Sequence, residues 1–238
     1  MRARRVLLKL SGESLSKGGG LSPISVKCLS RTANEIRSAV ADGRTQLAVV
    51  IGAGNLWRGA GSKFIERVAA DQMGILATIM NSLALNDALT KAGMQSKIFS
   101  ASGVVSNFVE NFNKEKVIEC IERGNIIIFA GGTGNPFFTT DTAAVLRAAE
   151  IEADVLLKAT QVDGVYDADP KKNKAAVKFD SLTFQEALDK RLEIMDFEAF
   201  SLCMRMNRSI TVFDFYKDNN LKKILDGEKI GTIVGGVK

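Results

Sequence analysis

The sequence predicts an α/β protein in which a mainly parallel sheet has helices on both faces. Short apolar runs alternate with longer amphipathic segments along the chain, and this alternation is typical of a parallel sheet. Glycine-rich polar loops follow several of the apolar runs, at the sheet edge where such folds bind ligands. With 238 residues, 46% of them hydrophobic, the chain can bury a large core, so we expect one domain over residues 1–238.

The apolar runs are short and bounded by turn-forming residues, so each is predicted to be a strand. They occupy residues 5–10, 46–51, 96–101, 125–130, 154–159, 210–215 and 231–234. We find no internal repeat and no domain linker between them.

Segments with apolar residues three and four positions apart are predicted to be helices. They occupy residues 22–42, 69–92, 113–123, 142–153, 196–207 and 221–226, with a further helix opened by the capping box at 183–186. Ser22 is the expected N-cap of the first helix, with Pro23 at its first helical position and Gly43 after its end. Met73 and Met80 in the second helix are expected in the core.

Composition excludes several classes of protein. The net charge of +5 is spread among 27 acidic residues without a dense basic run, so nucleic-acid binding is not favoured. A basic excess suits a small polyanionic substrate, although ordinary solubility accounts for it equally well. Cys28, Cys120 and Cys203 are odd in number and far apart, which indicates neither a disulfide framework nor a metal cluster.

The chain start and the apolar windows bear on location. The basic start resembles a signal peptide, but Lys9 interrupts its apolar run too early, and no other window is expected to reach the length of a membrane span. We therefore expect a cytoplasmic protein with no membrane partner.

The most informative stretch is the glycine loop at residues 131–141, Gly-Gly-Thr-Gly-Asn-Pro-Phe-Phe-Thr-Thr-Asp, between a predicted strand and a predicted helix. Its glycines let backbone N–H groups approach an anion, and the helix N-terminus adds a positive dipole. Its hydroxyl and amide groups can bond a polar ring. These features predict a site for a phosphate ester; a surface turn with a good N-cap is the alternative.

Cationic side chains accompany other strand ends. Lys9 and Lys158 lie in the first strand and in the strand after the central helix, near the edge where open α/β sheets bind ligands. The alternative for Lys9 is a strand lysine that extends its ammonium into water. A second glycine loop, residues 52–61, carries Arg58, whose planar guanidinium matches two phosphate oxygens.

This second loop belongs to neither of the two commonest phosphate-binding motifs. Trp57 stands where the third glycine of the dinucleotide fingerprint would fall. No Gly-Lys-Ser or Gly-Lys-Thr sequence completes a Walker loop.

Two further polar residues have open interpretations. Asp71, near the start of the second helix, either compensates the helix dipole, which the residues alone favour, or holds a ligand hydroxyl. Tyr166 follows the turn at Asp163-Gly164, and its ring offers a stacking face for a base. A polar hairpin with an ordinary buried tyrosine is the alternative for that segment.

These residues are consistent with phosphoryl transfer. Two lysines and an arginine beside glycine loops would neutralise a transferring phosphoryl group, and Asp141 at a helix start would orient the lysines. The chain contains no histidine. A phosphate or carboxylate oxygen attacks without a general base, so we expect a phosphotransferase with an acidic acceptor.

Five motifs together resemble the bacterial uridylate kinases of the amino acid kinase superfamily, over essentially the whole chain. They are Lys9-Leu10-Ser11-Gly12-Glu13, Asn55-Leu56-Trp57-Arg58-Gly59, Asp71-Gln72-Met73-Gly74, residues 133–141 and residues 158–166. The first and last are shared across the superfamily, whereas the 133–141 run is more specific to the uridylate branch.

The resemblance implies phosphoryl transfer from ATP, with Mg²⁺, to UMP in a three-layer α/β/α sandwich that assembles as a homohexamer. It implies an acceptor-binding half at about residues 1–150 and an ATP-binding half at about 151–238, and UTP as an inhibitor that competes for the UMP pocket. It leaves the metal ligands unknown.

The resemblance also implies roles for individual residues. Lys9, Leu10, Ser11 and Gly12 would hold the ATP phosphates, with Lys158 near them, Gly54 and Arg58 at the transfer point, and Thr160, Tyr166 and Asp169 at the ATP nucleoside. The UMP contacts would be Ala53, Asp71, Thr133, Gly134, Asn135, Pro136, Phe137, Phe138, Thr139 and Thr140. Asp141 would organise the two lysines, and the catalytic set would be Lys9, Arg58, Asp141 and Lys158.

Two departures from the family pattern matter. Ala53 stands where relatives usually have the second of three glycines, which requires a negative φ at this position. Residues 16–22 are shorter than the loop that belongs to the GTP effector site in many relatives, so activation by GTP stays open.

Two other functions remain as alternatives. A kinase of acetylglutamate, aspartate or carbamate would share Lys9, Gly12 and Asp163-Gly164 but not the 133–141 run. A non-catalytic nucleotide sensor or storage subunit would not need Lys9, Arg58, Asp141 and Lys158 intact.

Overall fold

The computed structural model describes residues 4–16, 22–59, 64–103 and 106–235. Most of the shortened segment 16–22 and the end of the second glycine loop, residues 60–61, lie outside the described residues.

The described residues form one sheet in the order β4-β3-β5-β2-β1-β6-β8-β9-β7. Its strands are β1 (Arg4–Leu10), β2 (Thr45–Ile51), β3 (Ser96–Ser100), β4 (Glu110–Asn111), β5 (Ile126–Ala130), β6 (Val155–Thr160), β7 (Ser181–Leu182), β8 (Ile210–Asp214) and β9 (Thr232–Val234). Neighbouring strands are parallel except β8 and β9, which are antiparallel. The carboxyl ends of the central strands therefore lie at one edge of the sheet.

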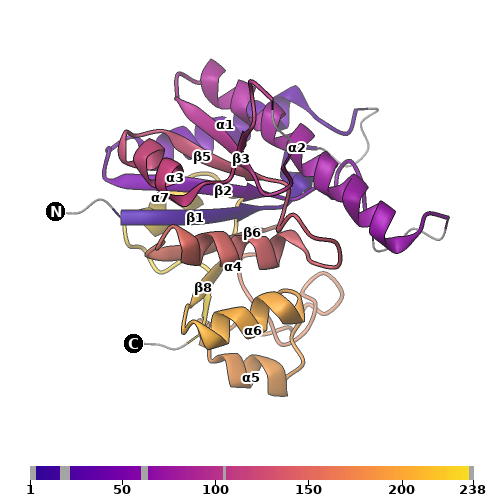
Figure 1. Cartoon of the computed structure of the whole chain (residues 1–238). Helices are drawn as coiled ribbons and strands as arrows, with labels where there is room; N and C mark the ends of the chain where they lie inside the picture. The colour runs from indigo at the N-terminus through magenta and orange to yellow at the C-terminus, as the bar shows by residue number, and fades with distance from the viewer. Residues whose placement is uncertain (1–3, 17–21, 60–63, 104–105, 236–238) are drawn as a thin grey trace.

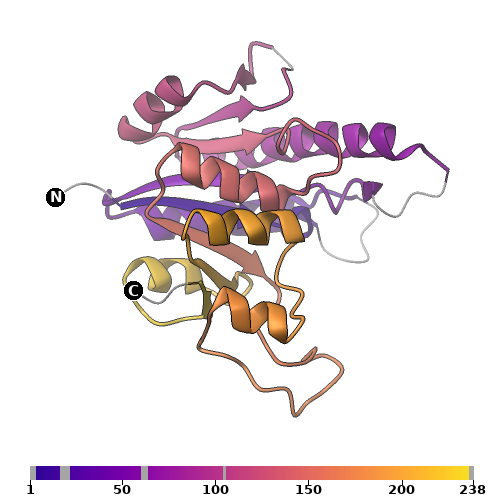
Figure 2. The ribbon, with the colours of Figure 1, turned by 60° about the horizontal axis from the view of Figure 1, so that its bottom comes forward.

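Helices cover both faces of this sheet (Figure 2). They are α1 (Val26–Val40), α2 (Arg67–Lys91), α3 (Lys114–Glu122), α4 (Thr140–Glu150), α5 (Phe184–Asp189), α6 (Phe197–Arg205) and α7 (Asn220–Leu225). Successive residues of β1 divide between two hydrophobic clusters, with Val6 and Leu8 in one and Leu7 in the other. Helices α1, α2 and α7 contribute to the first cluster, and α3 to α6 to the second. The predicted three-layer α/β/α sandwich is confirmed (Figure 1).

Two helix starts differ from the prediction. Helix α1 begins at Val26, and the Oγ of Ser25 accepts from the amide of Cys28, so Ser25 is the N-cap and the assignment of Ser22 and Pro23 is wrong. The Ser22 hydroxyl instead donates to the Ile24 carbonyl at 2.7 Å, a local turn that competes with capping. Helix α4 begins at Thr140, two residues earlier than expected, and Thr139 is its N-cap.

Helix α2 is the longest helix of the described chain, and its N-terminal end projects beyond the sheet (Figure 1). Met73 and Met80 are 39% and 55% exposed, so their expected place in the core is wrong. The helix is apolar around much of its surface, and periodicity does not tell which side faces the sheet. By length and composition only, this 25-residue helix could cross a membrane, since an 18-residue window of it has a mean hydropathy of 1.3, contrary to the sequence prediction. Leu85 and Leu89 are nevertheless fully buried in the core, as expected for a core helix.

The three cysteines lie in helices and are free thiols. Cys203 is buried in α6, and this burial raises the pKa of its thiol to about 12. A thiol with this pKa stays protonated and unreactive at neutral pH.

Candidate functional site

Lys9 and Lys158 lie side by side at the carboxyl ends of β1 and β6, where they are register partners. The two ammonium groups converge on Asp141: Lys9 Nζ is 2.7 Å from Oδ1 and Lys158 Nζ is 2.6 Å from Oδ2. Each of the three side chains is 13% exposed, so Lys9 is not a strand lysine that extends into water. The structure thus brings together the lysine–carboxylate–lysine cluster that the sequence predicted.

The cluster is electrostatically self-consistent. Burial by itself would raise the pKa of Asp141, but the charges of Lys9 and Lys158 outweigh it and hold that pKa below its usual range. Burial lowers the pKa of Lys158, and the Asp141 carboxylate opposes part of this change. Asp141 is therefore a charged carboxylate that keeps two cations close together in a poorly hydrated place.

The start of α4 fixes Asp141. Asp141 lies in the first turn of α4, and its amide donates to the hydroxyl of the N-cap Thr139 at 2.9 Å. The Thr139 hydroxyl in turn donates to Asp196, the N-cap of α6, which also accepts from Thr142 at 2.8 Å. The sequence indicated Asp196 only as a helix start, because its contacts to α4 join segments far apart in the chain.

The second glycine loop packs against the beginning of the 3₁₀ helix η1 (Gly12–Leu15). A Cβ on Gly12 would lie 2.3 Å from Asn55 Oδ1 and 2.6 Å from the Gly52 carbonyl, so only glycine fits. The backbone of Ala53 keeps a negative φ, which is the condition that the sequence set for an alanine here.

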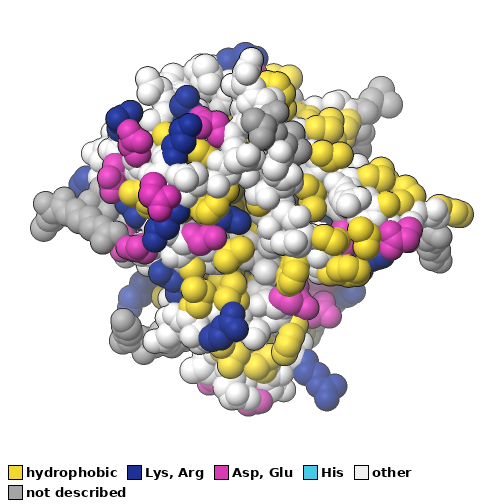
Figure 3. Space-filling model, in the orientation of Figure 1, with side chains coloured by type: hydrophobic (Ala, Val, Ile, Leu, Met, Phe, Trp, Pro, Cys, Tyr) yellow, Lys and Arg dark blue, Asp and Glu magenta, His cyan; other side chains and the backbone are white. Residues whose placement is uncertain are grey.

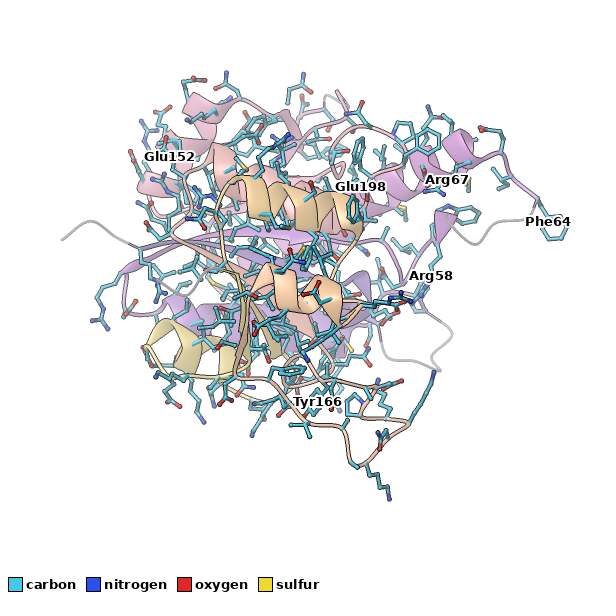
Figure 4. The ribbon with its side chains drawn as sticks, turned by 90° about the horizontal axis from the view of Figure 1, so that it is seen from below. Arg58, Phe64, Arg67, Glu152, Tyr166 and Glu198 are labelled. Atoms are coloured by element: carbon cyan, nitrogen blue, oxygen red, sulfur yellow. The ribbon has the colours of Figure 1, made fainter. Side chains whose placement is uncertain are left out.

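Arg58 lies in the cleft but is already paired. Its guanidinium forms an ion pair with Glu13, and its Nε donates to the Gly54 carbonyl at 3.3 Å. The Arg58 side chain is 71% exposed, in contrast to the buried lysines. Figure 4 shows Arg58 near the edge of the molecule. Glu13 also accepts from Gln161 at 3.1 Å and so connects the two sides of the cleft. Glu13 belongs to the motif at residues 9–13, and the sequence alone indicates no role for it.

The loop after β5 adopts a left-handed conformation at several positions. Gly131, Gly132 and Gly134 have φ values of 78°, 58° and 83°, which glycine adopts without strain. Phe137 also has a positive φ, 71°, and its amide donates to Asp71 Oδ2 at 2.8 Å.

Asp71 supports this loop rather than the dipole of its helix. It lies beyond the first turn of α2, so the dipole role that the residues alone favoured is wrong. Its Oδ2 pairs with Arg67 Nε at 2.7 Å and accepts from the Phe137 amide. Arg67 also lies 5.5 Å from the centre of the Phe137 ring. Figure 4 shows Arg67 and Arg58 on the same side of the molecule, where α2 projects.

Three cavities follow one another along the carboxyl edge of the sheet. The first, about 710 Å³, lies between the two glycine loops and α2 and is lined by Ala53, Gly54, Arg58, Asp71, Thr133, Asn135, Phe138, Thr139 and Thr140 among others. The second, about 260 Å³, contains Lys9, Lys158 and Thr160. The third, about 440 Å³, contains Thr160, Tyr166 and Asp169. Ser11 and Glu13 line both the first and the second cavity, and Thr160 lines both the second and the third.

Some predicted residues do not reach these cavities with their side chains. Gly134, Pro136 and Phe137 are absent from the described lining of the first cavity, and the Phe137 ring is 59% exposed. Leu10 is fully buried, so only its backbone faces the neighbouring loop, where its carbonyl accepts from Gly52. Thr160 does line two of the cavities, but its hydroxyl already donates to the Val162 carbonyl at 2.7 Å.

Tyr166 is half-buried and lines the third cavity, so it is not an ordinary buried tyrosine. Its hydroxyl donates to Asp163 at 2.5 Å, and this hydrogen bond raises the pKa of the phenol. Figure 4 shows Tyr166 on the loop after β6. The hydrogen bond therefore fixes the Tyr166 ring in the third cavity, at the other end of the row from the cavity between the two glycine loops.

The described residues contain no group of three or more histidine, cysteine, aspartate or glutamate side chains able to hold a metal ion. A hard cation bound mainly through substrate phosphates, with one or two protein oxygens, does not require such a group.

A parallel sheet with glycine loops and cations at its carboxyl edge is typical of phosphate-binding α/β proteins. A model of the amino acid kinase family matches residues 4–214. Uridylate kinases of Parabacteroides distasonis and Bacteroides thetaiotaomicron are each 48% identical over 233 residues, 97% of this chain and 98% of theirs. The chain belongs to the amino acid kinase family, and the resemblance to bacterial uridylate kinases is confirmed.

Solved structures agree. The UMP kinase of Ureaplasma parvum has a TM-score of 0.91 and 36% identity, covering 99% of this chain and 100% of that one. The UMP kinase of Bacillus anthracis has a TM-score of 0.92 and 36% identity, covering 99% and 97%. The more distant uridylate kinase of Archaeoglobus fulgidus has a TM-score of 0.71 and 29% identity.

Proposed function

We propose that this protein transfers the γ-phosphate of ATP to UMP and so produces ADP and UDP, a step of pyrimidine nucleotide biosynthesis. The observation that carries the proposal is the buried Lys9–Asp141–Lys158 cluster at the meeting point of the cavities. The 48% identity to uridylate kinases over 97% of the chain supports UMP as the acceptor.

In this proposal the cavities bind different parts of the two nucleotides. UMP occupies the 710 Å³ cavity, with its phosphate toward Gly54 and Arg58 and its ribose toward Asp71. The nucleoside of ATP occupies the cavity at Tyr166 and Asp169, and its phosphates lie along Lys9, Ser11 and Lys158. We propose an acceptor-binding half at about residues 1–150 and an ATP-binding half at about 151–238, with Lys9 and Ser11 of the first half also contacting the ATP phosphates.

The residues of the chain supply charge and orientation rather than proton transfer. The UMP phosphate oxygen attacks the γ-phosphorus directly, and the bond to the ADP oxygen breaks. Lys9 and Lys158 stabilise the negative charge on the transferring phosphoryl group. The Asp141 carboxylate offsets the repulsion between the two ammonium groups by pairing with both. The Arg58 guanidinium, which pairs with Glu13 through one nitrogen, has further N–H donors with which to contact a phosphate. Mg²⁺ bound to ATP would neutralise charge on the β- and γ-phosphates.

Assembly and regulation are part of the same proposal. Met73, Leu76 and Met80 leave an apolar surface exposed on α2, and hydrophobic side chains gather over that helix in Figure 3. Such a surface supports self-association, and we propose a homohexamer. UTP would inhibit by occupying the UMP cavity, and whether GTP acts as an allosteric activator stays open. The three free thiols are consistent with a cytoplasmic protein.

An acceptor panel tests the proposal. ATP consumption is measured with UMP, CMP, AMP, aspartate and acetylglutamate, each with and without Mg²⁺. We expect turnover with UMP and dependence on the metal. Turnover confined to an amino acid would reject the proposal in favour of a carboxylate kinase, and nucleotide binding without turnover would favour a sensor.

A further inference from the structure

The long helix α2 carries a polar stripe along the side that faces the two glycine loops. The stripe consists of Asp71, Thr78 and Asn81, spaced about two turns and then one turn apart. Thr78 and Asn81 are 3% and 0% exposed. Buried polar side chains in an otherwise apolar helix are costly unless each has a partner. The partners of this stripe are the backbones of the two glycine loops.

Asn81 holds the second glycine loop at its first peptide. Its Nδ2 donates to the Gly52 carbonyl at 2.8 Å and to Asn55 Oδ1 at 2.7 Å, and its Oδ1 accepts from Asn55 Nδ2 at 3.1 Å. The paired amides lie directly over Gly12, since a Cβ there would meet Asn55 Oδ1. Asn81 thus fixes the second glycine loop against the start of η1, the 3₁₀ helix that follows β1.

The hydrogen bond to Gly52 also sets the direction of the next amide. In a trans peptide the carbonyl of one residue and the N–H of the next point in opposite directions. Because the Gly52 carbonyl points to Asn81, the Ala53 N–H points away from it, and Ala53 lines the 710 Å³ cavity. The amides of Ala53 and Gly54 donate to no acceptor among the described residues, so both remain available to an anion.

Thr78 holds the other loop in the same way, one turn earlier on the helix. Its hydroxyl accepts from the Gly131 amide at 2.8 Å and donates to the Ile75 carbonyl at 2.7 Å. Gly131 is the first residue after β5 and has a positive φ of 78°. Asp71 then holds the Phe137 amide near the far end of that loop. One helix therefore sets the separation of the two loops that would enclose the acceptor.

We propose that Asn81 and Thr78 are positioning residues for phosphoryl transfer: they hold the two glycine loops so that the free amides of Ala53 and Gly54 face the acceptor phosphate. The proposal rests on the assignment of the acceptor cavity above. It predicts that loss of these hydrogen bonds weakens UMP binding and slows turnover beyond any effect on folding.

The chain offers a matched control in the same helix. Ser82 is fully buried beside Asn81, but its hydroxyl donates only to the Thr78 carbonyl of α2 itself, at 2.8 Å. Ser82→Ala therefore measures the cost of removing a buried polar group from this helix without touching either loop.

The experiment compares Asn81→Asp, Thr78→Val, Thr78→Ser and Ser82→Ala. Asn81→Asp keeps the shape and the acceptor oxygen but loses the donor to Gly52. The measurements are the UMP dissociation constant by calorimetry without ATP, kcat, the KM for ATP and the melting temperature. For Asn81→Asp we expect UMP affinity to fall at least about tenfold and kcat to fall with it. Thr78→Val should lower UMP affinity and kcat by less than Asn81→Asp does. Thr78→Ser, which keeps the hydroxyl, should have UMP affinity and kcat near those of the wild type.

The outcomes separate the possibilities. Ser82→Ala should change the melting temperature while UMP affinity and kcat stay within about twofold. Asn81→Asp kinetics equal to those of Ser82→Ala would overturn the proposal, as would a rise in the KM for ATP alone. If Asn81→Asp does not fold, the Thr78 pair decides, and equal kinetics for valine and serine would overturn it. Failure of wild-type protein to bind UMP would instead refute the acceptor cavity.

Discussion

The two glycine loops at the sheet edge use glycine for different physical reasons. After β5, Gly131, Gly132 and Gly134 all have positive φ, so glycine is needed for the conformation itself. After β2, none of the described glycines, Gly52, Gly54 and Gly59, has a positive φ. Gly52 is limited by space, since a Cβ would lie 3.2 Å from Thr140 Oγ1, and Gly54 has only ordinary contacts. This difference explains how Ala53 is accommodated in the second loop.

The loops also end in different electrostatic surroundings. The Gly131 loop enters α4, where Asp141 is buried between two lysines. The second glycine loop carries Arg58, which is mostly exposed and paired with Glu13. A buried ion cluster depends on every member, whereas an exposed pair contributes little to stability. For the charged residues of the two loops, we therefore expect a large effect of substitution at Asp141 and only a small effect on stability at Arg58.

The largest effect is expected at Asp141. Asp141→Asn removes the charge that holds two ammonium groups together, and kcat should fall about a hundredfold or more while the protein stays folded. Steady-state kinetics with circular dichroism as the folding control measures this. Near-normal turnover would show that Asp141 has no such role.

The next largest effect is a difference in stability between alanine substitutions in the two loops. Gly134 has a φ of 83°, and a Cβ would lie 2.6 Å from the Ala101 carbonyl. Gly134→Ala should therefore lower the free energy of unfolding by about 1–3 kcal/mol. Gly54→Ala, where the nearest atom is 3.8 Å away, is the matched control and should cost less. Equal losses in urea unfolding would contradict the comparison.

The pH dependence of turnover tests the buried cluster. Burial lowers the pKa of Lys158, so activity should decline on the alkaline side at a lower pH than an ordinary lysine would give. Asp141→Asn removes the carboxylate that raises this pKa, so the decline should move to still lower pH. Residual kcat of the variant against pH measures the shift, and an unchanged profile would argue against Lys158 as the titrating group.

The same cluster affects stability in acid. The folded-state pKa of Asp141 is below its unfolded value, so its stabilising contribution is present above the unfolded pKa. That contribution is lost as pH falls through the folded pKa. Asp141→Asn should remove this part of the acid dependence of unfolding.

The smallest effect is expected at Ala53. Its φ is negative, so Ala53→Gly gains no access to a required conformation. The substitution should lower stability by about 0.4–1 kcal/mol through the greater freedom of the unfolded chain. UMP affinity should change by less than about twofold, as titration calorimetry would show. A large gain in UMP affinity would mean that the methyl group obstructs the acceptor.

The sequence predicted the order of the main strands and helices because their apolar periodicity is local information. It missed β4 and β7, which have two residues each, and it placed the first N-cap at Ser22 rather than Ser25. Two serines three residues apart give the same local signal, and the hydrogen bond from the Ser25 amide to the Leu15 carbonyl is not local.

At the site, the sequence predicted residues whose chemistry is unusual for their position, such as Lys9, Lys158 and Asp141. It missed Thr78 and Asn81, because their partners lie on loops far away in the chain. Their only local signal was a pair of polar residues in an apolar helix. Which side of α2 faces outward was equally hidden, so Met73 and Met80 were misplaced.

In the proposed function the two ends of the cleft bind different nucleotides, UMP near Asp71 and ATP near Tyr166. Calorimetric dissociation constants for UMP and for ATP, measured on Asp71→Asn and Tyr166→Ala, test it most directly. Asp71→Asn should weaken UMP about tenfold and leave ATP within about twofold, and Tyr166→Ala should do the reverse. Loss of ATP affinity alone in Asp71→Asn, or equal losses of both nucleotides in both variants, would contradict the account.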